Sequence, residues 1–262
     1  MSAFRNIREA LLVALAALTP LAPLALIPVA SCVPLYQKTS DGLQQEFTSH
    51  IPARTAVLPC QTWRFVDLTP ADRKILCDRL DESVMDGFRA QPYMRGFSPK
   101  VVDKLLDQAK WPTAVSEGFG IILEATSKPR CITRDKPMCA GPAALYAESL
   151  AANAAWQMWL ARFSDVQKHA DAVLIPILVS ATDDRGNDRG MIALSRSVHF
   201  SMWLVDTTTG KLIWTRSKSG IETTRALPEK SANLKAPEWS EPLKRALTQD
   251  FWRDYPGRLV LD

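Results

Sequence analysis

The pattern of hydrophobic and polar positions divides the chain near Cys32. Residues 10–27 form an almost uninterrupted apolar run that follows Arg5 and Arg8, and the chain turns polar directly after Cys32. From residue 54 onwards, apolar positions recur with the spacings of strands and helices. The chain therefore divides into an apolar leading segment and a folded remainder.

The first part of the folded remainder predicts a strand followed by two helices. Residues 54–59 form a short apolar run that proline stops, which indicates a strand. Helices are expected after Thr69 and Ser98, because each precedes a proline suited to the first helical position and then apolar residues at helical spacing. The run 119–123 is too short for its periodicity to separate a strand from a helical turn.

A long helix and a buried strand are predicted next. Apolar residues follow Gly141 as a stripe that reaches Phe163, so one continuous helix is expected there. The run 171–179 is almost wholly apolar, which predicts a central strand buried on both faces. Residues 183–190 are polar and rich in Asp, Arg and Gly, and they predict a loop.

A hairpin and a closing helix complete the predicted fold. In residues 192–206 apolar side chains alternate with polar ones, and the turn at 208–210 leads into a second strand. Residues 221–236 are expected to be irregular, and residues 237–254 to form an amphipathic helix. The summed elements predict an α/β (α+β) fold, in which helices pack on a mixed β-sheet with a C-terminal hairpin.

The residues before Cys32 match the cleavage site of a bacterial lipoprotein signal peptide. Residues 29–31, Val-Ala-Ser, supply an aliphatic residue followed by two small ones. A membrane-spanning helix is one alternative, but three prolines interrupt a run that is already shorter than the roughly 20 residues a span needs. An ordinary cleaved signal with an incidental cysteine is the other. We expect residues 1–31 to be removed and Cys32 to carry lipid, palmitate included.

This anchor sets the expected domain organisation and location. Residues 32–53 are polar with little periodicity and predict a flexible membrane tether. Residues 54–262 predict a single periplasmic domain with its core at 54–218. Val33, rather than Asp, follows the cysteine, which in enteric-type sorting is typical of the outer membrane. Retention at the inner membrane remains the alternative.

Charge bears on the choice of partner. The formal net charge is +4, and removal of Arg5, Arg8 and Glu9 with the signal leaves +3. Both signs are spread along the chain, whereas a nucleic-acid binder clusters basic residues on one face. We therefore expect the membrane as a partner through Cys32, together with an envelope protein or the peptidoglycan machinery, and no nucleic acid. Homo-oligomerisation is left open.

Four cysteines besides Cys32 remain in the mature chain, and an even number in an oxidising compartment predicts two disulfides. The short segment between Cys131 and Cys139 favours that pair and leaves Cys60 with Cys77 by elimination. Free buried thiols remain an alternative. A zinc site is disfavoured because no cysteine pair has two-residue spacing and the chain holds three histidines. No metal is expected, and no cofactor apart from the covalent lipid.

Three stretches together resemble a group of periplasmic lipoproteins. They are Arg-Thr-Ala-Val-Leu-Pro at 54–59, Ala-Asp-Ala-Val-Leu-Ile at 170–175, and Leu-Val-Asp-Thr-Thr-Thr-Gly-Lys-Leu-Ile-Trp at 204–214. The group contains the curli-secretion (CsgG-like) lipoprotein and LpoB, with the TolB N-terminal domain as a distant relative. The resemblance implies a sheet that the first stretch opens, with the second central and the third as an edge hairpin. It implies no catalytic residues, since such proteins bind or activate partners or assemble into pores.

An enzyme is the rival class. His199 lies among Ser195, Ser197 and Ser201 with Asp206 nearby in sequence, so a base beside a nucleophilic serine is conceivable. No Gly-x-Ser-x-Gly elbow is present, and an ordinary polar sheet face explains the same pattern. We therefore expect a non-catalytic protein that binds or regulates an envelope partner. The alternatives are an envelope hydrolase around His199 and a subunit of an export assembly.

Two further features are candidates for binding. The chain has eight tryptophans, and exposed indoles stack on sugars. Most lie on apolar stripes, which leaves Trp63 and Trp111 as the surface candidates. The polar residues 183–190 could offer oxygen ligands to calcium, but they lack the regular alternation and the closing Glu of an EF-hand loop. A solvated loop is the expected reading of that segment.

Overall fold

The structure is a computed structural model, and its description here covers residues 42–43 and 52–256, apart from 64–65, 67, 92–93, 128–141 and 169. All of these residues belong to one compact unit, residues 34–262. The predicted signal peptide, Cys32 and the pair Cys131–Cys139 lie outside the described residues.

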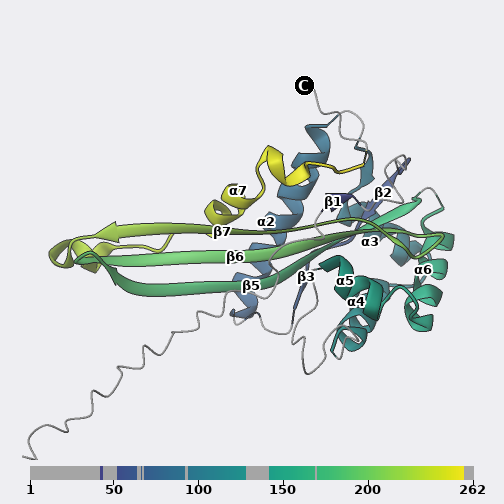
Figure 1. Cartoon of the computed structure of the whole chain (residues 1–262), viewed down its shortest axis with the longest axis horizontal. Helices are drawn as coiled ribbons and strands as arrows, with labels where there is room; N and C mark the ends of the chain where they lie inside the picture. Colours follow the sequence, from purple (N-terminus) through teal and green to yellow (C-terminus); the bar gives the residue numbers. More distant parts are fainter. Residues whose placement is uncertain are drawn as a thin grey trace, which may run out of the picture. The chain divides into compact units, whose positions relative to one another are not determined.

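A seven-stranded mixed sheet forms the centre of this unit (Figure 1). Its strand order is β1-β7-β6-β5-β2-β4, and β3 also pairs with β5. Strands β2, β3 and β4 are joined in parallel, whereas β5, β6, β7 and β1 are antiparallel neighbours. The strands are β1 (Gly42–Leu43), β2 (Thr55–Val57), β3 (Gln61–Thr62), β4 (Gly96–Phe97), β5 (Ala172–Asp188), β6 (Met191–Asp206) and β7 (Leu212–Ala226).

Helices cover both faces of the sheet, so the predicted α/β class with a mixed sheet is confirmed. One core packs α2, α7 and η3 against Phe200 and Met202 of β6. The other packs α3 to α6 against Val173 and Ile175 of β5. The helices are α2 (Pro70–Arg89), α3 (Pro99–Gln108), α4 (Ala114–Ala125), α5 (Pro142–Ser149), α6 (Ala154–Val166) and α7 (Ser240–Ala246), with the 3-10 helices η2 (Pro228–Asn233) and η3 (Gln249–Trp252).

Helix α2 begins where the sequence predicts. The hydroxyl oxygen of Thr69 accepts a hydrogen bond from the backbone N–H of Asp72 at 3.1 Å, and Pro70 occupies the first turn. The residues that face the sheet are buried at helical spacing: Leu76, Leu80, Val84 and Phe88. The helix from Ser98 is confirmed as α3, and the ambiguous run 119–123 lies within helix α4.

Strands β5, β6 and β7 are far longer than the sequence predicts, at 17, 16 and 15 residues. Figure 1 shows their distal halves continuing past helices α3 to α6, with α7 alongside. We call these distal halves, residues 180–188, 191–201 and 217–226, the arm. The arm ends in a two-residue turn at Arg189 and Gly190, both with positive φ, at 53° and 81°. This conformation matches the twist of paired strands.

The predicted loop at 183–190 is therefore wrong, because β5 continues to Asp188. In this part of β5 the strand is stabilised by pairing with side chains of other strands and not by burial of apolar residues. Asp183 pairs with Arg196 at 2.9 Å, and Asp188 pairs with Arg225 at 2.7 Å. The pattern lacks alternating apolar residues because the distal part of β5 is largely exposed.

The long helix predicted from Gly141 is also wrong, because it is divided into α5 and α6. Its second half restarts at Asn153, whose side-chain oxygen accepts a hydrogen bond from the N–H of Trp156 at 3.0 Å. An N-terminal cap of this kind favours a new helix start. The break places Tyr146 and Trp156 in one core, where the indole N–H donates to the tyrosine hydroxyl at 2.8 Å.

Two C-terminal predictions fail for related reasons. Residues 221–226 are strand rather than irregular chain, because β7 remains paired with β6 up to Ala226. The closing helix is interrupted at Leu247, whose ψ of 48° leaves the helical region, and the chain resumes as η3. This interruption lets Trp252 of η3 stack on Trp214 in the core, while Phe251 and Tyr255 meet the ring of Trp214 edge-on.

Part of the predicted tether belongs to the sheet. Gly42 and Leu43 form β1 and pair with Thr215 and Trp214 of β7. The other tether residues that precede Pro52 lie outside the described residues, so a flexible tether over the rest of that stretch stays a prediction.

Candidate functional site: the polar face of the arm

One face of the arm carries mostly short polar side chains, and we call it the polar face. The two faces of the arm differ because alternate residues of a strand, such as β6, point to opposite sides of the sheet. On the polar side the apolar core ends at Trp203, whereas on the other side it continues to Val198. The polar face is formed by Ser180, Thr182, Asp184, Gly186, Asp188, Met191, Ala193, Ser195, Ser197, His199, Ser201, Ser217, Ser219, Ile221, Thr223 and Arg225.

The hydroxyl groups of the polar face bond to one another across the strands. Cross-strand side-chain pairs of this kind contribute roughly 0.2–1 kcal/mol each. They form a ladder that joins all three strands of the arm. Its cross-strand members are Thr182 with Ser197 at 2.8 Å, Ser195 with Thr223 at 2.9 Å, His199 with Ser219 at 2.7 Å, and Ser217 with Ser201 at 3.0 Å.

The opposite face of the arm is covered by the C-terminal segment. Gly220 has no side chain because α7 crosses it, and a Cβ there would collide with the backbone carbonyl of Pro242. Arg196 lies over the ring of Trp239 at 4.5 Å and donates to the carbonyl oxygen of Pro237 at 2.9 Å. The two faces of the arm are therefore unlike, with one packed and the other polar.

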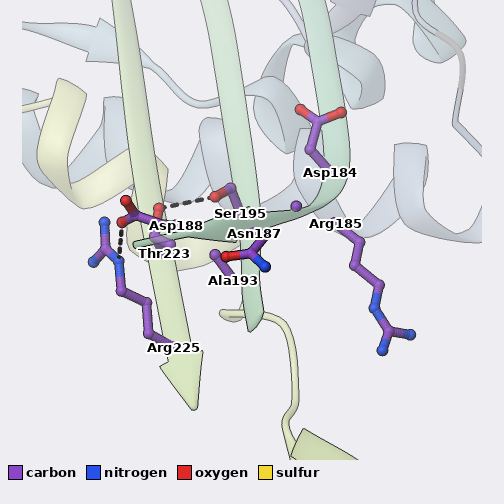
Figure 2. A pocket seen from close by; sticks show the side chains of 9 residues that line it. Asp184, Arg185, Asn187, Asp188, Ala193, Ser195, Thr223 and Arg225 are labelled. Atoms are coloured by element: carbon purple, nitrogen blue, oxygen red, sulfur yellow. Dashed lines mark hydrogen bonds and ion pairs between the residues drawn. The ribbon is translucent and has the colours of Figure 1, made fainter. Parts of the chain in front are cut away.

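A hollow of about 290 Å³ lies on the polar face near the tip of the arm (Figure 2). Gly186 and Ala193 line it with almost no side chain, which leaves the depression. Figure 2 shows Asp188 and Arg225 joined by an ion pair at one side, while the side chain of Arg185 points away. The hollow can take a small group, such as one side chain of a partner, beside the ion pair of Asp188 and Arg225.

His199 is the buried titratable group of this face, with 5% of its surface exposed. Burial lowers the pKa of its imidazole to about 4, so the ring is neutral at pH 7. Its Nδ1 contacts Ser219, not one of the three serines that the sequence placed nearest to it on β6. A neutral, packed imidazole fits the predicted sheet-face role.

The catalytic alternative at His199 is not assembled. Asp206 is seven residues further along the same strand, which separates the two by about 23 Å at the usual rise of a strand. The Asp206 carboxylate instead accepts hydrogen bonds from the backbone N–H groups of Thr208 at 2.9 Å and Thr209 at 2.6 Å. Asp206 therefore shapes the β6–β7 turn and does not orient the imidazole.

The three stretches behind the family resemblance meet at one corner of the sheet. The carboxylate of Asp171 accepts from the N–H groups of Ala53 at 2.8 Å and Arg54 at 3.1 Å. Its backbone carbonyl accepts from the N–H of Thr207 at 3.1 Å. The acidic residues of these stretches thus hold the fold together.

The tryptophans chosen as surface candidates are largely inside. Trp111 is 3% exposed, its N–H donates to Glu117 at 2.8 Å, and Arg162 lies over its ring at 3.9 Å. Its prediction as a surface residue is wrong, because helices distant in sequence cover it. Trp63 is half-buried and meets Trp203 edge-on at 6.5 Å. Neither offers a free indole platform for a sugar.

Cys60 and Cys77 form a disulfide, the pair that elimination left in the sequence. It ties the segment after β2 to helix α2. The neighbouring Asp81, which no sequence pattern singles out, accepts a hydrogen bond through its carboxylate from the N–H of Cys60 at 2.9 Å. Burial raises the pKa of Asp81 to about 7.

Two features are absent from the described part of the chain. No group of three or more His, Cys, Asp or Glu side chains is arranged there to hold a metal ion. No helix within it has the length and apolar character needed to cross a membrane.

Comparisons with known proteins identify no family. No family model and no curated protein matches the sequence. Among solved structures, the chain is similar to lipoprotein GNA1162 from Neisseria meningitidis, with a TM-score of 0.34, 15% identity, and 66% of this chain and 85% of that chain covered.

Two other solved structures are similar to a comparable degree. The PelC dodecamer from Paraburkholderia phytofirmans has a TM-score of 0.32 and 11% identity, over 79% of this chain and 89% of that chain. The C-terminal domain of LpoB from Salmonella enterica has a TM-score of 0.28 and 10% identity, over 73% and 87%. Likenesses this low assign neither a family nor an activity.

Proposed function

We propose that this chain is a lipid-anchored protein of the bacterial cell envelope that acts without catalysis, by binding a protein partner through the polar face. The observation that carries this proposal is the unlike character of the two faces of the arm. The C-terminal segment packs on one face at Gly220 and Arg196, while no apolar core continues on the other.

The composition of the polar face suits a protein contact. Ile221 is 62% exposed and is surrounded on this face by hydroxyl-bearing side chains, an apolar point within a polar rim. Short side chains lose little rotamer freedom when a partner orders them. The hollow near Asp188 and Arg225 adds a place for one side chain of the partner.

The anchor part of the proposal rests on the sequence around Cys32. Residues 29–31 and the apolar run before them have the order of a lipoprotein signal, and lipid on Cys32 would hold the domain at the membrane. Val33 favours the outer membrane, with the domain in the periplasm. The partner is then an envelope protein, with the peptidoglycan machinery as one source.

Lipid attachment is tested with a radioactive fatty acid fed to the producing cells. The proposal expects label on the wild-type chain and none on Cys32→Ala. An unlabelled wild type, or equal labelling of the two chains, would contradict the anchor.

Binding through the polar face is tested by photo-crosslinking in cells. A photoreactive amino acid is placed at Thr182 or at Asp184, both exposed on the polar face. The matched control carries it at Lys244, which is exposed on α7. The proposal expects the same protein adduct from both polar-face positions and none from Lys244. The proposal fails if Lys244 gives the same adduct or the polar-face positions give none.

A further inference from the structure

Another hollow, of about 170 Å³, lies between helix α3, strand β4 and the end of helix α6, and we call it the α6 pocket. It is lined by Phe97, Leu105, Val166, Gln167 and Lys168. Figure 1 shows α3 and α6 at the end of the sheet away from the tip of the arm. The α6 pocket is therefore separate from the polar face.

Gln167 is the buried polar residue of the α6 pocket, with 2% of its surface exposed. Its backbone N–H donates to the carbonyl oxygen of Phe163 at 2.8 Å, and its own carbonyl oxygen accepts from the N–H of Ala170 at 2.6 Å. The side-chain amide, by contrast, has no hydrogen-bond partner at its nitrogen or its oxygen among the described residues. Such an unpaired buried group is rare and costly. The amide can therefore donate one hydrogen bond to a bound group and accept another from it.

The other walls of the α6 pocket are apolar. Phe97, Leu105 and Val166 are half-buried, so each presents part of an apolar side chain. Phe97 and Val166 also pack on the core beneath α3 to α6, which holds them in place. At about 170 Å³ the pocket is smaller than the roughly 300–1,000 Å³ of sites for drug-sized ligands. Its size suits one short apolar group, such as a single amino-acid side chain.

A cation completes the lining of the pocket. Lys168 directly follows Gln167 in the chain and is exposed, so it marks the outer part of the pocket. It makes no ion pair with another described residue. A hydrogen bond between an ammonium group and a carboxylate is stronger than one between neutral groups. The outer part of the pocket therefore favours an anionic group of a ligand.

We propose that the α6 pocket binds the carboxyl-terminal residue of a peptide, one with a short apolar side chain. The N–H of that residue donates to Oε1 of Gln167, and its carboxylate accepts from Nε2 of Gln167 and from Nζ of Lys168. One amide reaches both groups because the N–H and C=O of an extended residue point to the same side. The side chain of the bound residue lies against Phe97, Leu105 and Val166.

Simpler ligands use fewer of these groups. A fatty acid has a carboxylate for Lys168 and an apolar body, but it has no N–H to donate to Oε1 of Gln167. A neutral carboxamide pairs with Gln167 and gains no charge-assisted bond from Lys168. The end of a peptide presents the N–H, the carboxylate and the side chain together, and capture of a terminal carboxylate is a recurring mode of peptide recognition.

The test is isothermal titration calorimetry of the full chain in detergent with the peptide acetyl-Gly-Gly-Val. A terminal carboxamide removes the charge and is expected to weaken binding at least about tenfold. A terminal glycine in place of valine removes the apolar side chain and is expected to weaken it at least about tenfold as well. Acetylvaline alone should bind no more tightly than the longer peptide, since the chain before the last residue leaves through the open side.

Two variants of the pocket test the assigned contacts. Gln167→Leu removes both hydrogen-bonding groups at similar volume, so peptide binding is expected to fall at least about tenfold while the stability of the protein does not fall. Lys168→Ala should weaken binding about threefold and narrow the preference for the carboxylate over the carboxamide. The matched control is Lys230→Ala, at an exposed lysine of η2, which should change neither quantity.

Three results would overturn the proposal: no binding of acetyl-Gly-Gly-Val at millimolar concentration, equal binding of its carboxamide, or full binding by Gln167→Leu. Tighter binding of acetylvaline than of the peptide would also exclude a peptide ligand. If Gln167→Leu does not fold, Lys168→Ala decides, because an exposed side chain can be shortened without loss of the fold.

This proposal does not rest on the proposed function, and the two can fail separately. Ser197→Arg changes the polar face and is expected to leave peptide binding in the α6 pocket unchanged. Peptide binding without an adduct at Thr182 keeps the α6 pocket and removes the partner site on the polar face. An adduct at Thr182 without peptide binding keeps the partner site and removes the α6 pocket.

Discussion

The Nδ1 atom of His199 lies 2.7 Å from the hydroxyl oxygen of Ser219 on the neighbouring strand. The contact joins β6 to β7 within the polar face, and it holds a buried imidazole. The imidazole is thus one member of the hydrogen-bonded ladder that crosses the polar face. Its consequences for stability, fold and binding can be measured separately.

The first prediction concerns acid stability. Burial puts the pKa of His199 at about 4 in the folded protein, against 6.5 for the unperturbed ring. Between these values the unfolded chain binds a proton that the folded chain does not, so this group removes stability as the pH falls from 6.5 to 4. The loss amounts to about 3 kcal/mol at pH 4.

Urea unfolding of wild type and His199→Gln at pH 7.5 and pH 4.5 isolates this contribution. Relative to the variant, the wild type is expected to lose stability at the lower pH. A stability difference between the two that does not change with pH would show that the imidazole is not held neutral.

Asp81 predicts the opposite pH dependence. Its pKa is raised from 3.8 to about 7, so the folded state keeps a proton that the unfolded state releases as the pH rises through this range. The stability contributed by Asp81 is present below pH 3.8 and is lost by pH 7. Asp81→Asn removes this dependence. The free energy of unfolding of the variant minus that of wild type is therefore expected to be more favourable at pH 7 than at pH 4. A constant difference between the two proteins contradicts the prediction.

Helix α7 can be tested at a single glycine. Gly220→Ala drives a methyl group into the backbone of Pro242, and overpacking of this kind costs about 1–3 kcal/mol or more. The control is Gly186→Ala in β5, where nothing lies within 4 Å of the added Cβ, and the expected change is within about 0.5 kcal/mol. Equal unfolding midpoints for the two variants would mean that α7 does not press on the arm.

The disulfide between Cys60 and Cys77 is expected to stabilise the fold. The two residues are 17 apart in sequence, and closing a loop of this size contributes about 3 kcal/mol. Replacing both by serine should lower the free energy of unfolding by that order, measured in urea. Unchanged stability in the Cys60 and Cys77 double variant would contradict the prediction.

The sequence predicts best those elements whose residues are buried along their whole length. Thr69 and Pro70 mark the start of α2, and the apolar run 171–179 marks the buried half of β5, because burial and capping both leave a local pattern. The distal half of β5 has no such pattern. Its strand is set by pairing with β6, as between Asp183 and Arg196, and such long-range partners are not visible in one segment.

The candidate site divides in the same way. The alternation in β6 placed His199 and its neighbouring serines on one polar face, which the structure confirms. The partners across the strand, such as Ser219, required the register of β7. Trp111 was misplaced because Arg162 covers it from a helix about fifty residues later. When a residue is buried by an element distant in sequence, the residues next to it in sequence show no pattern that reveals the burial.

Binding through the polar face is measured as the affinity of the purified chain for the protein captured at Thr182. Ser197→Arg puts a long charged side chain on the polar face, and Lys244→Glu alters an exposed residue of α7. When the unfolding midpoints of the variants are equal, binding is expected to be at least about tenfold weaker for Ser197→Arg and unchanged for Lys244→Glu. Unchanged binding by Ser197→Arg, or equal weakening by both, would contradict a partner site on the polar face.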